Sequence, residues 1–266
     1  MKKSFKFALA LTVSAAAIMF SGCKELKDIT AFNDLVNYYR FITPDDERDL
    51  GKYYYAAGQI DEYHKDGDPN TVQFVLPEVN GIPVRGLGYS NFINSNNINH
   101  NSAVIEKIYI PSTVARTNGR YFGNCKRELT VYYSGNSALI MKDLIDNSDG
   151  YNHVLYVWSG MYSYFEKYLA KMGGGLSVHK GNVAYMFNAD DMPNYYATEC
   201  YYVDYVEYGE KIMRRPPEPV REGYEFEGWY IEPDCQTEWS GNYMVPEPEE
   251  GNDYREICLY AKWVKD

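Results

Sequence analysis

The feature that most constrains the fold is an internal repeat in the first half of the chain. The apolar positions of residues 84–92 return 30 residues later in residues 114–122, and Leu76-Pro77 and Ile110-Pro111 precede the two copies. One such unit cannot bury its apolar edge alone, so copies must stack on one another. From Tyr53 onward, short alternating segments are interrupted by Gly, Pro and Asn, which is typical of strands joined by turns. The sequence therefore predicts a stack of strand-and-turn units.

The repeated residues resemble the BspA-like leucine-rich repeats of bacterial surface proteins. The resemblance covers residues 53–182 and implies a short, weakly curved stack. Residues 155–159 are similar to the repeat strand, with Trp158 in place of Pro, and a closing helix is predicted from Met161 to its stop at the glycines of 173–175. Residues 134–152 depart from the repeat pattern. The residues that carry the resemblance are Leu76, Pro77, Val84, Leu87, Gly88 and Phe92 in the first copy and Ile108, Ile110, Pro111, Val114, Phe122 and Cys125 in the second.

The last part of the chain carries a second signature. Residues 223–230 read Gly-Tyr-Glu-Phe-Glu-Gly-Trp-Tyr, and residues 259–263 read Leu-Tyr-Ala-Lys-Trp. These segments resemble the Listeria-Bacteroides repeat, also called the internalin B-repeat. The resemblance implies that residues 183–266 form a small β-grasp-like module of a cell-surface protein. Strands are expected at 183–187 and 201–206, and the acidic segments 190–191 and 247–253 are expected to be surface loops.

The first 22 residues have the pattern of a secretion signal. Three lysines precede an uncharged stretch of residues 7–20, which is shorter than the ~20 residues that a membrane-spanning helix needs. Ser21 and Gly22 lead directly to Cys23, which resembles the lipobox of bacterial lipoproteins. The resemblance implies cleavage before Cys23 and acylation of its thiol, so that the chain is exported and held on a membrane by lipid, facing outward in the cell envelope.

Residues 23–52 are expected to be a lipid-anchored spacer, with an amphipathic helix over 24–43. Beyond the anchor, export places four cysteines where disulfides can persist. Their pairing stays open, because four thiols allow three pairings. No pair has the Cys-x-x-Cys spacing of a zinc knuckle or a redox site. These cysteines are Cys125, Cys200, Cys235 and Cys258.

Charge and residue spacing exclude several classes of function. The formal charge is −11, and removal of the three lysines of residues 1–22 makes it −14, so nucleic acid would be repelled. The four histidines, at 64, 100, 153 and 179, show no metal or catalytic spacing. The acidic groups at 61–68 and 247–253 are interpreted as solvated turns rather than calcium sites. We therefore expect no catalytic residues, no metal and no cofactor.

Tyrosine is abundant, with 28 residues that often occur in neighbouring pairs such as Tyr132-Tyr133 and Tyr201-Tyr202. Because neighbours on a strand point to opposite faces, we expect one ring of each pair in the core and the other partly in water. An exposed ring could stack on a sugar or anchor a protein.

Together these observations predict a mainly β protein with short helices, in which a short leucine-rich-repeat stack precedes a β-grasp-like module. The resemblance to surface antigens implies a non-catalytic lipoprotein that binds a protein partner as an adhesin or scaffold. The alternative is a glycan-binding lipoprotein that aids polysaccharide capture. The ligand-binding residues are unknown at this stage, although a continuous strand face including residues 105–110 and 72–76 would suit an extended partner, expected to be neutral or basic at the contact.

Overall fold

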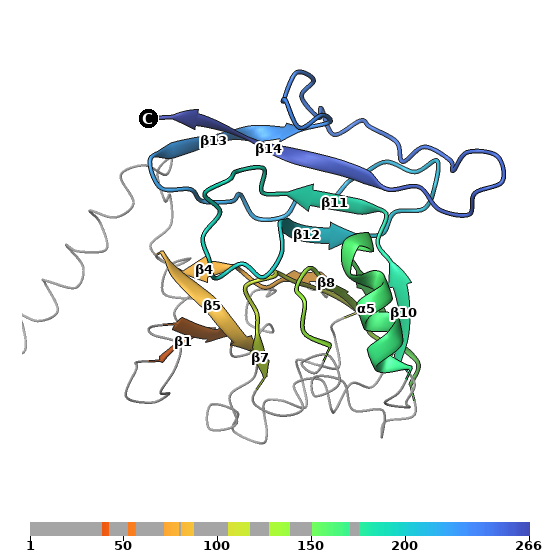
Figure 1. The fold of residues 1–266 in the computed structure, drawn as a ribbon, viewed down its shortest axis with the longest axis horizontal. Coiled ribbons are helices and arrows are strands. Elements are labelled where there is room, and N and C mark those ends of the chain that lie inside the picture. Colours follow the sequence, from red (N-terminus) through yellow and green to blue (C-terminus); the bar gives the residue numbers. More distant parts are fainter. Residues whose placement is uncertain are drawn as a thin grey trace, which may run out of the picture.

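The computed structural model describes residues 39–42, 53–56, 72–79, 81–87, 106–117, 128–138, 151–170 and 176–266. These residues are mainly strands, with the helix α5 (Ser159–Leu169) among them, and the predicted fold class, mainly β with short helices, is confirmed (Figure 1). The signal segment 1–22, the lipidation residue Cys23 and the cysteine Cys125 lie outside the described residues.

Five strands form a parallel sheet in which spatial order follows chain order. The strands are β3 (Val72–Phe74), β6 (Lys107–Ile110), β8 (Thr130–Tyr133), β9 (His153–Val157) and β10 (Leu176–Lys180). All neighbouring pairs in it are parallel, and β6, β8 and β9 present buried side chains to the same core, against which Leu176 and Val178 of β10 pack partly buried. This arrangement is a stack of strand units, as the sequence repeat predicts.

A second sheet contains the sequence repeat itself. In it β5 (Ile82–Leu87) lies parallel to β7 (Arg116–Thr117), with Leu87 paired to Thr117. The offset of this pair is the 30 residues of the repeat, and Val84 and Val114 are both fully buried in one core. The interpretation of the two copies as stacked neighbours is therefore confirmed. The remaining strands of this sheet are β1 (Tyr39–Ile42), β2 (Tyr53–Ala56) and β4 (Glu78–Val79).

Strand β1 corrects the helix that the sequence predicts over residues 24–43. Residues 39–42 pair antiparallel with β2 instead of continuing a helix. A short apolar periodicity is a weak prior, and strand pairing across the chain overrides it. Residues 24–38 lie outside the described residues.

Helix α5 packs against the parallel sheet where the closing helix is expected. Phe165 is buried, and Met161, Tyr162 and Leu169 pack around the same core. Tyr168, three residues after Phe165, is 42% exposed, so it does not belong to the buried face of α5. The helix ends at Leu169, before the glycines at 173–175.

The C-terminal sheet has the strand order β12-β11-β14-β13. Its central pair, β11 (Val183–Met186) and β14 (Ile257–Lys265), is parallel, and the flanking strands β12 (Cys200–Asp204) and β13 (Tyr224–Tyr230) are antiparallel to them. The strands expected near 183–187 and 201–206 are thus present. Within residues 176–266 the structure has no helix, so the β-grasp-like fold stays a prediction.

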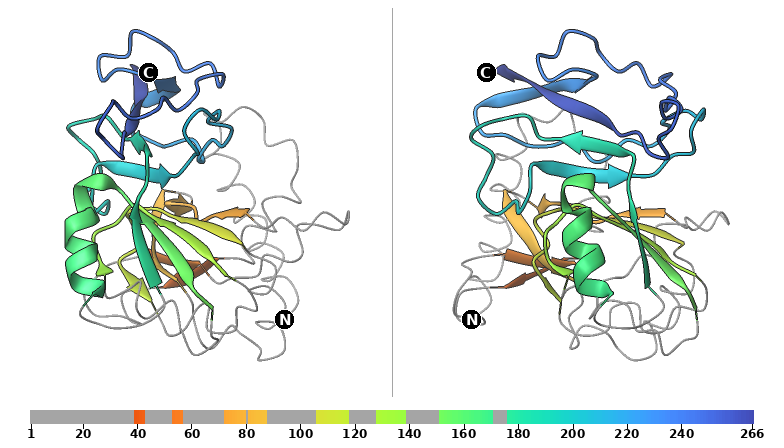
Figure 2. Two further views of the ribbon diagram at one scale, coloured as in Figure 1. Left: turned by 90° about the vertical axis from the view of Figure 1, so that its right-hand side faces the viewer. Right: turned by 45° about the vertical axis from the view of Figure 1, so that its right-hand side comes forward.

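The C-terminal sheet lies directly against the parallel sheet, with β12 next to β6, β8 and β9 (Figures 1 and 2). The connection is tight, because a Cβ on Gly181 would lie 2.2 Å from Cγ2 of Val203. The Ser159 hydroxyl at the start of α5 donates to Oε2 of Glu256 (2.8 Å), which precedes β14. The expected regions 53–182 and 183–266 are therefore joined by close packing rather than by an open linker.

Candidate functional site

One face of the parallel sheet carries a row of aromatic side chains. Strand register places the same position of all five strands side by side, so the rings stack across the sheet. The ring centroids lie 4.2, 4.3, 5.2 and 5.6 Å apart in order. This aromatic ladder consists of Phe74, Tyr109, Tyr132, Tyr156 and His179.

The C-terminal sheet covers the middle of the aromatic ladder. Tyr109 is 1% exposed and Tyr132 is 2% exposed, and both belong to the core of the C-terminal sheet. The Tyr202 hydroxyl on β12 donates to the carbonyl oxygen of Val75. The face proposed for an extended partner is therefore closed at Tyr109 and Tyr132.

The same packing corrects the expectation for the tyrosine pairs. Tyr133 is 1% exposed in the core of the stack, while its neighbour Tyr132 is buried against the C-terminal sheet. Tyr201 and Tyr202 are also both buried. Both rings of each pair are covered because both faces of these strands are packed.

A buried polar network joins the two sheets. The Tyr109 hydroxyl donates to Oδ1 of Asp204 (2.7 Å) and accepts from Nη1 of Arg214 (2.7 Å). The backbone amide of Tyr205 also donates to Oδ1 (2.8 Å). Oδ2 of Asp204 is buried and has no hydrogen-bond partner among the residues that the structure describes. Burial raises the pKa of the Asp204 carboxyl, although the hydrogen bond from Tyr109 acts in the opposite direction.

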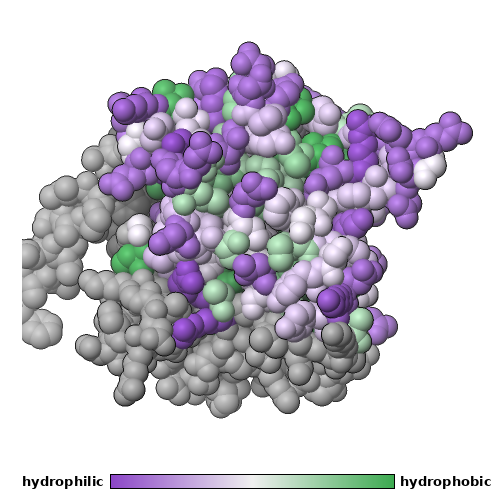
Figure 3. All heavy atoms as spheres, viewed as in Figure 1, coloured by the Kyte–Doolittle hydropathy of each residue, from purple (hydrophilic) through white to green (hydrophobic). Residues whose placement is uncertain are grey.

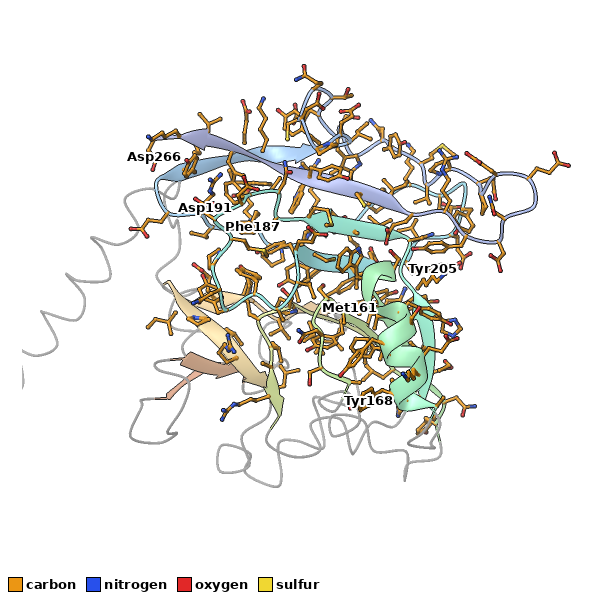
Figure 4. The ribbon with its side chains drawn as sticks, viewed as in Figure 1. Met161, Tyr168, Phe187, Asp191, Tyr205 and Asp266 are labelled. Atoms are coloured by element: carbon orange, nitrogen blue, oxygen red, sulfur yellow. The ribbon has the colours of Figure 1, made fainter. Side chains whose placement is uncertain are left out.

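This network borders a pocket of about 380 Å³ at the junction of the two sheets. Strands β6, β8 and β9 supply one wall, and the segment that follows β12 supplies the other. Tyr205, labelled in Figure 4, begins that segment. The lining residues are Lys107, Thr130, Tyr132, Tyr156, Asp204, Tyr205, Val206, Glu207, Lys211, Met213 and Arg214. We call this site the junction pocket.

The rings of Tyr156 and Tyr205 form an aromatic wall of the junction pocket. Their centroids lie 4.8 Å apart with an interplanar angle of 17°, so the two rings are stacked. Both side chains are half-buried, and Met213 beside them is 76% exposed. Burial raises the pKa of Tyr156 to about 12, so its hydroxyl stays protonated at neutral pH. The wall combines flat apolar surface with hydroxyl donors.

Two of the four histidines, His153 and His179, belong to the described residues, whereas His64, His100 and the acidic group at 61–68 lie outside them. His153 is buried, and its Nδ1 accepts from the Leu129 amide (3.1 Å), whereas His179 is exposed at the edge of the aromatic ladder. Across the described part of the chain, no three His, Cys, Asp or Glu side chains cluster as metal ligands. Cys200, Cys235 and Cys258 are free thiols.

The acidic loops lie where the sequence predicts them. Asp190 and Asp191 are exposed, and Asp191 pairs with Arg221 (2.8 Å). Glu249 and Glu250 are exposed on the loop before β14, and hydrophilic residues gather over the C-terminal loops in Figure 3. Their interpretation as surface loops is confirmed.

Sequence reasoning missed the junction pocket. Its charged groups lie far apart in the chain, since Lys107 precedes β8 and Arg214 follows β12. A signal for the aromatic ladder is nevertheless present, because Tyr109, Tyr132, Tyr156 and His179 follow one another at steps of 23, 24 and 23 residues. The 30-residue sequence repeat belongs to the other sheet, in which Leu87 pairs with Thr117.

The helices of the described segments include none that is both long and apolar enough to cross a membrane. No curated protein and no solved structure matches the chain. A family match bears out the resemblance seen in the sequence of the C-terminal region. Residues 182–262 match the family of the Listeria-Bacteroides repeat domain.

Proposed function

We propose that this chain is an exported lipoprotein that binds a ligand at the cell surface without catalysing a reaction. The apolar segment 7–20 and the Ser-Gly-Cys sequence that ends at Cys23 support export and lipid anchoring in the cell envelope. The match to the Listeria-Bacteroides repeat, a surface-associated family, supports an outward-facing location. The parallel stack supports the assignment of residues 53–182 to BspA-like leucine-rich repeats.

The junction pocket is the observation that carries the choice of ligand, and it favours a glycan. Tyr156 and Tyr205 line the pocket and bring apolar ring atoms and hydroxyl groups that a sugar can contact. Lysine, arginine and carboxylate groups around them offer hydrogen-bond donors and acceptors for sugar hydroxyls. The volume of about 380 Å³ suits a small group rather than a folded partner.

A protein partner is the second candidate, favoured by a different surface. Tyr164 and Tyr168 are 38% and 42% exposed on α5, and their rings lie 5.0 Å apart. Exposed tyrosines are common anchors of protein interfaces. In this case the chain would act as an adhesin or scaffold through α5.

A binding array of glycans and host matrix proteins tests these proposals with the full chain. We expect glycan binding that Tyr156→Ala removes and Tyr164→Ala leaves intact. Protein binding that only Tyr164→Ala removes would favour the adhesin instead. Cleavage of a polysaccharide or peptide at a rate that one point substitution abolishes would overturn the non-catalytic proposal.

The lipid anchor is tested by labelling cells with a radioactive fatty acid. We expect the label in the wild-type chain and none in Cys23→Ala, while Cys258→Ala, which leaves the lipobox unchanged, keeps it. An unmodified chain that retains Met1, seen by mass spectrometry, would contradict the proposal.

A further inference from the structure

Among the residues that the structure describes, one cation of the junction pocket has no partner. Lys107 is half-buried on β6, and its ammonium makes no hydrogen bond or ion pair with the residues that the structure describes. Burial, and then repulsion from Arg214, lower the pKa of Lys107. An anionic group bound between these two side chains would relieve that repulsion.

Local charge outweighs the charge of the whole chain at this site. The protein has a formal charge of −11, which disfavours anions at long range. Within the pocket, however, the three cations Lys107, Lys211 and Arg214 face the two carboxylates Asp204 and Glu207. Contact energies are set by the nearest charges, because salt screens the distant ones.

We infer that the junction pocket binds a hexuronic acid residue of an acidic glycan. This inference rests on the proposed glycan-binding function and names the sugar class. The ligand carboxylate would lie at Lys107 and Arg214. The sugar ring would lie against Tyr156 and Tyr205, which line the pocket. A carboxylate, a flat ring face and hydroxyls occur together in a hexuronic acid, whereas a neutral sugar has no group for the Lys107 cation.

Calorimetric titration of the full chain with trigalacturonate and with galactotriose tests the inference. The two probes differ chiefly in their carboxylates. We expect a dissociation constant for trigalacturonate that is lower than that for galactotriose by a factor of about ten or more. Lys107→Gln should weaken trigalacturonate binding by a similar factor and weaken galactotriose binding much less, because only trigalacturonate loses a charge pair. Lys167→Gln, an exposed change on α5, is the matched control and should change neither.

Three outcomes would overturn the inference and also separate it from the proposed function. If both trimers bound with equal affinity and Tyr156→Ala abolished that binding, the glycan proposal would stand and the preference for a hexuronic acid would be rejected. Oligoglutamate binding as tightly as trigalacturonate, and sensitive to Lys107→Gln, would reject the sugar and indicate an acidic peptide. Absence of binding to either trimer, with an array free of glycan signals, would reject both proposals.

Discussion

Tyr109 on β6 and Asp204 at the end of β12 lie 95 residues apart in the chain, yet the phenol hydroxyl donates to Oδ1 of the carboxylate at 2.7 Å. The bond joins the parallel sheet to the C-terminal sheet, and Arg214 completes it by donating to the same hydroxyl. It also fixes Asp204 beside the junction pocket. The stability of the junction and the shape of the pocket therefore depend on the same side chains.

Tyr109→Phe should destabilise the protein by about 1 to 3 kcal/mol, because the hydrogen bond is buried and its acceptor is a carboxylate. Urea unfolding followed by tyrosine and tryptophan fluorescence measures this change. Tyr168→Phe, at an exposed ring, is the matched control and should leave the midpoint unchanged. Equal midpoints for both variants would show that the Tyr109 hydroxyl contributes nothing.

Trp229→Ala should cost about 3 to 5 kcal/mol, as expected for removal of a large core ring. Trp229 is 5% exposed and lies 5.0 Å from Tyr185 and 5.3 Å from Phe226, measured between ring centroids. The loss is measured by chemical denaturation, with Val264→Ala on neighbouring β14, which is 44% exposed, as the control. A neutral result at Trp229 would be incompatible with its place in the core.

Asp204 should make stability depend on pH. Its folded pKa lies above the ordinary value of 3.8, because burial disfavours the charged form. The folded state thus binds more protons than the unfolded state, so this contribution is fully present below pH 3.8 and is lost as the pH rises through the folded pKa.

This dependence is measured as the difference in unfolding free energy between wild type and Asp204→Asn across pH. The unfolding free energy of the wild type relative to that of Asp204→Asn should fall as the pH rises above about 4. Asp190→Asn, at an exposed carboxylate, serves as the control and should give a difference that does not change with pH. If the wild type instead gained stability relative to Asp204→Asn as the pH rises, the raised pKa of Asp204 would be contradicted.

A break between the two regions should not separate them. A protease site inserted between Gly173 and Gly174 leaves intact the contacts of Tyr109, Tyr132 and Tyr202 across the junction. The two fragments should therefore elute together from a sizing column after cleavage and separate only in denaturant. Elution as two folded fragments would instead show that the parts before and after the cut fold independently of each other.

Local patterns were enough to predict much of the fold. The 30-residue offset corresponds to the pairing of β5 with β7, and the apolar steps from Met161 correspond to α5. The motif at 223–230 forms β13, where Gly228, at a φ of 154°, lies at the bulge opposite β14. These elements depend on neighbours in sequence, whose spacing determines which face each side chain takes.

The tertiary structure alone decided what covers those faces. Strand alternation places Tyr132 and Tyr133 on opposite faces, but it does not state that the C-terminal sheet closes the face of Tyr132. The meeting of Tyr109, Asp204 and Arg214 depends in the same way on how two sheets pack. Sequence periodicity determines the direction of a side chain, whereas burial, hydrogen bonding and charge in the junction pocket depend on contacts between segments about a hundred residues apart.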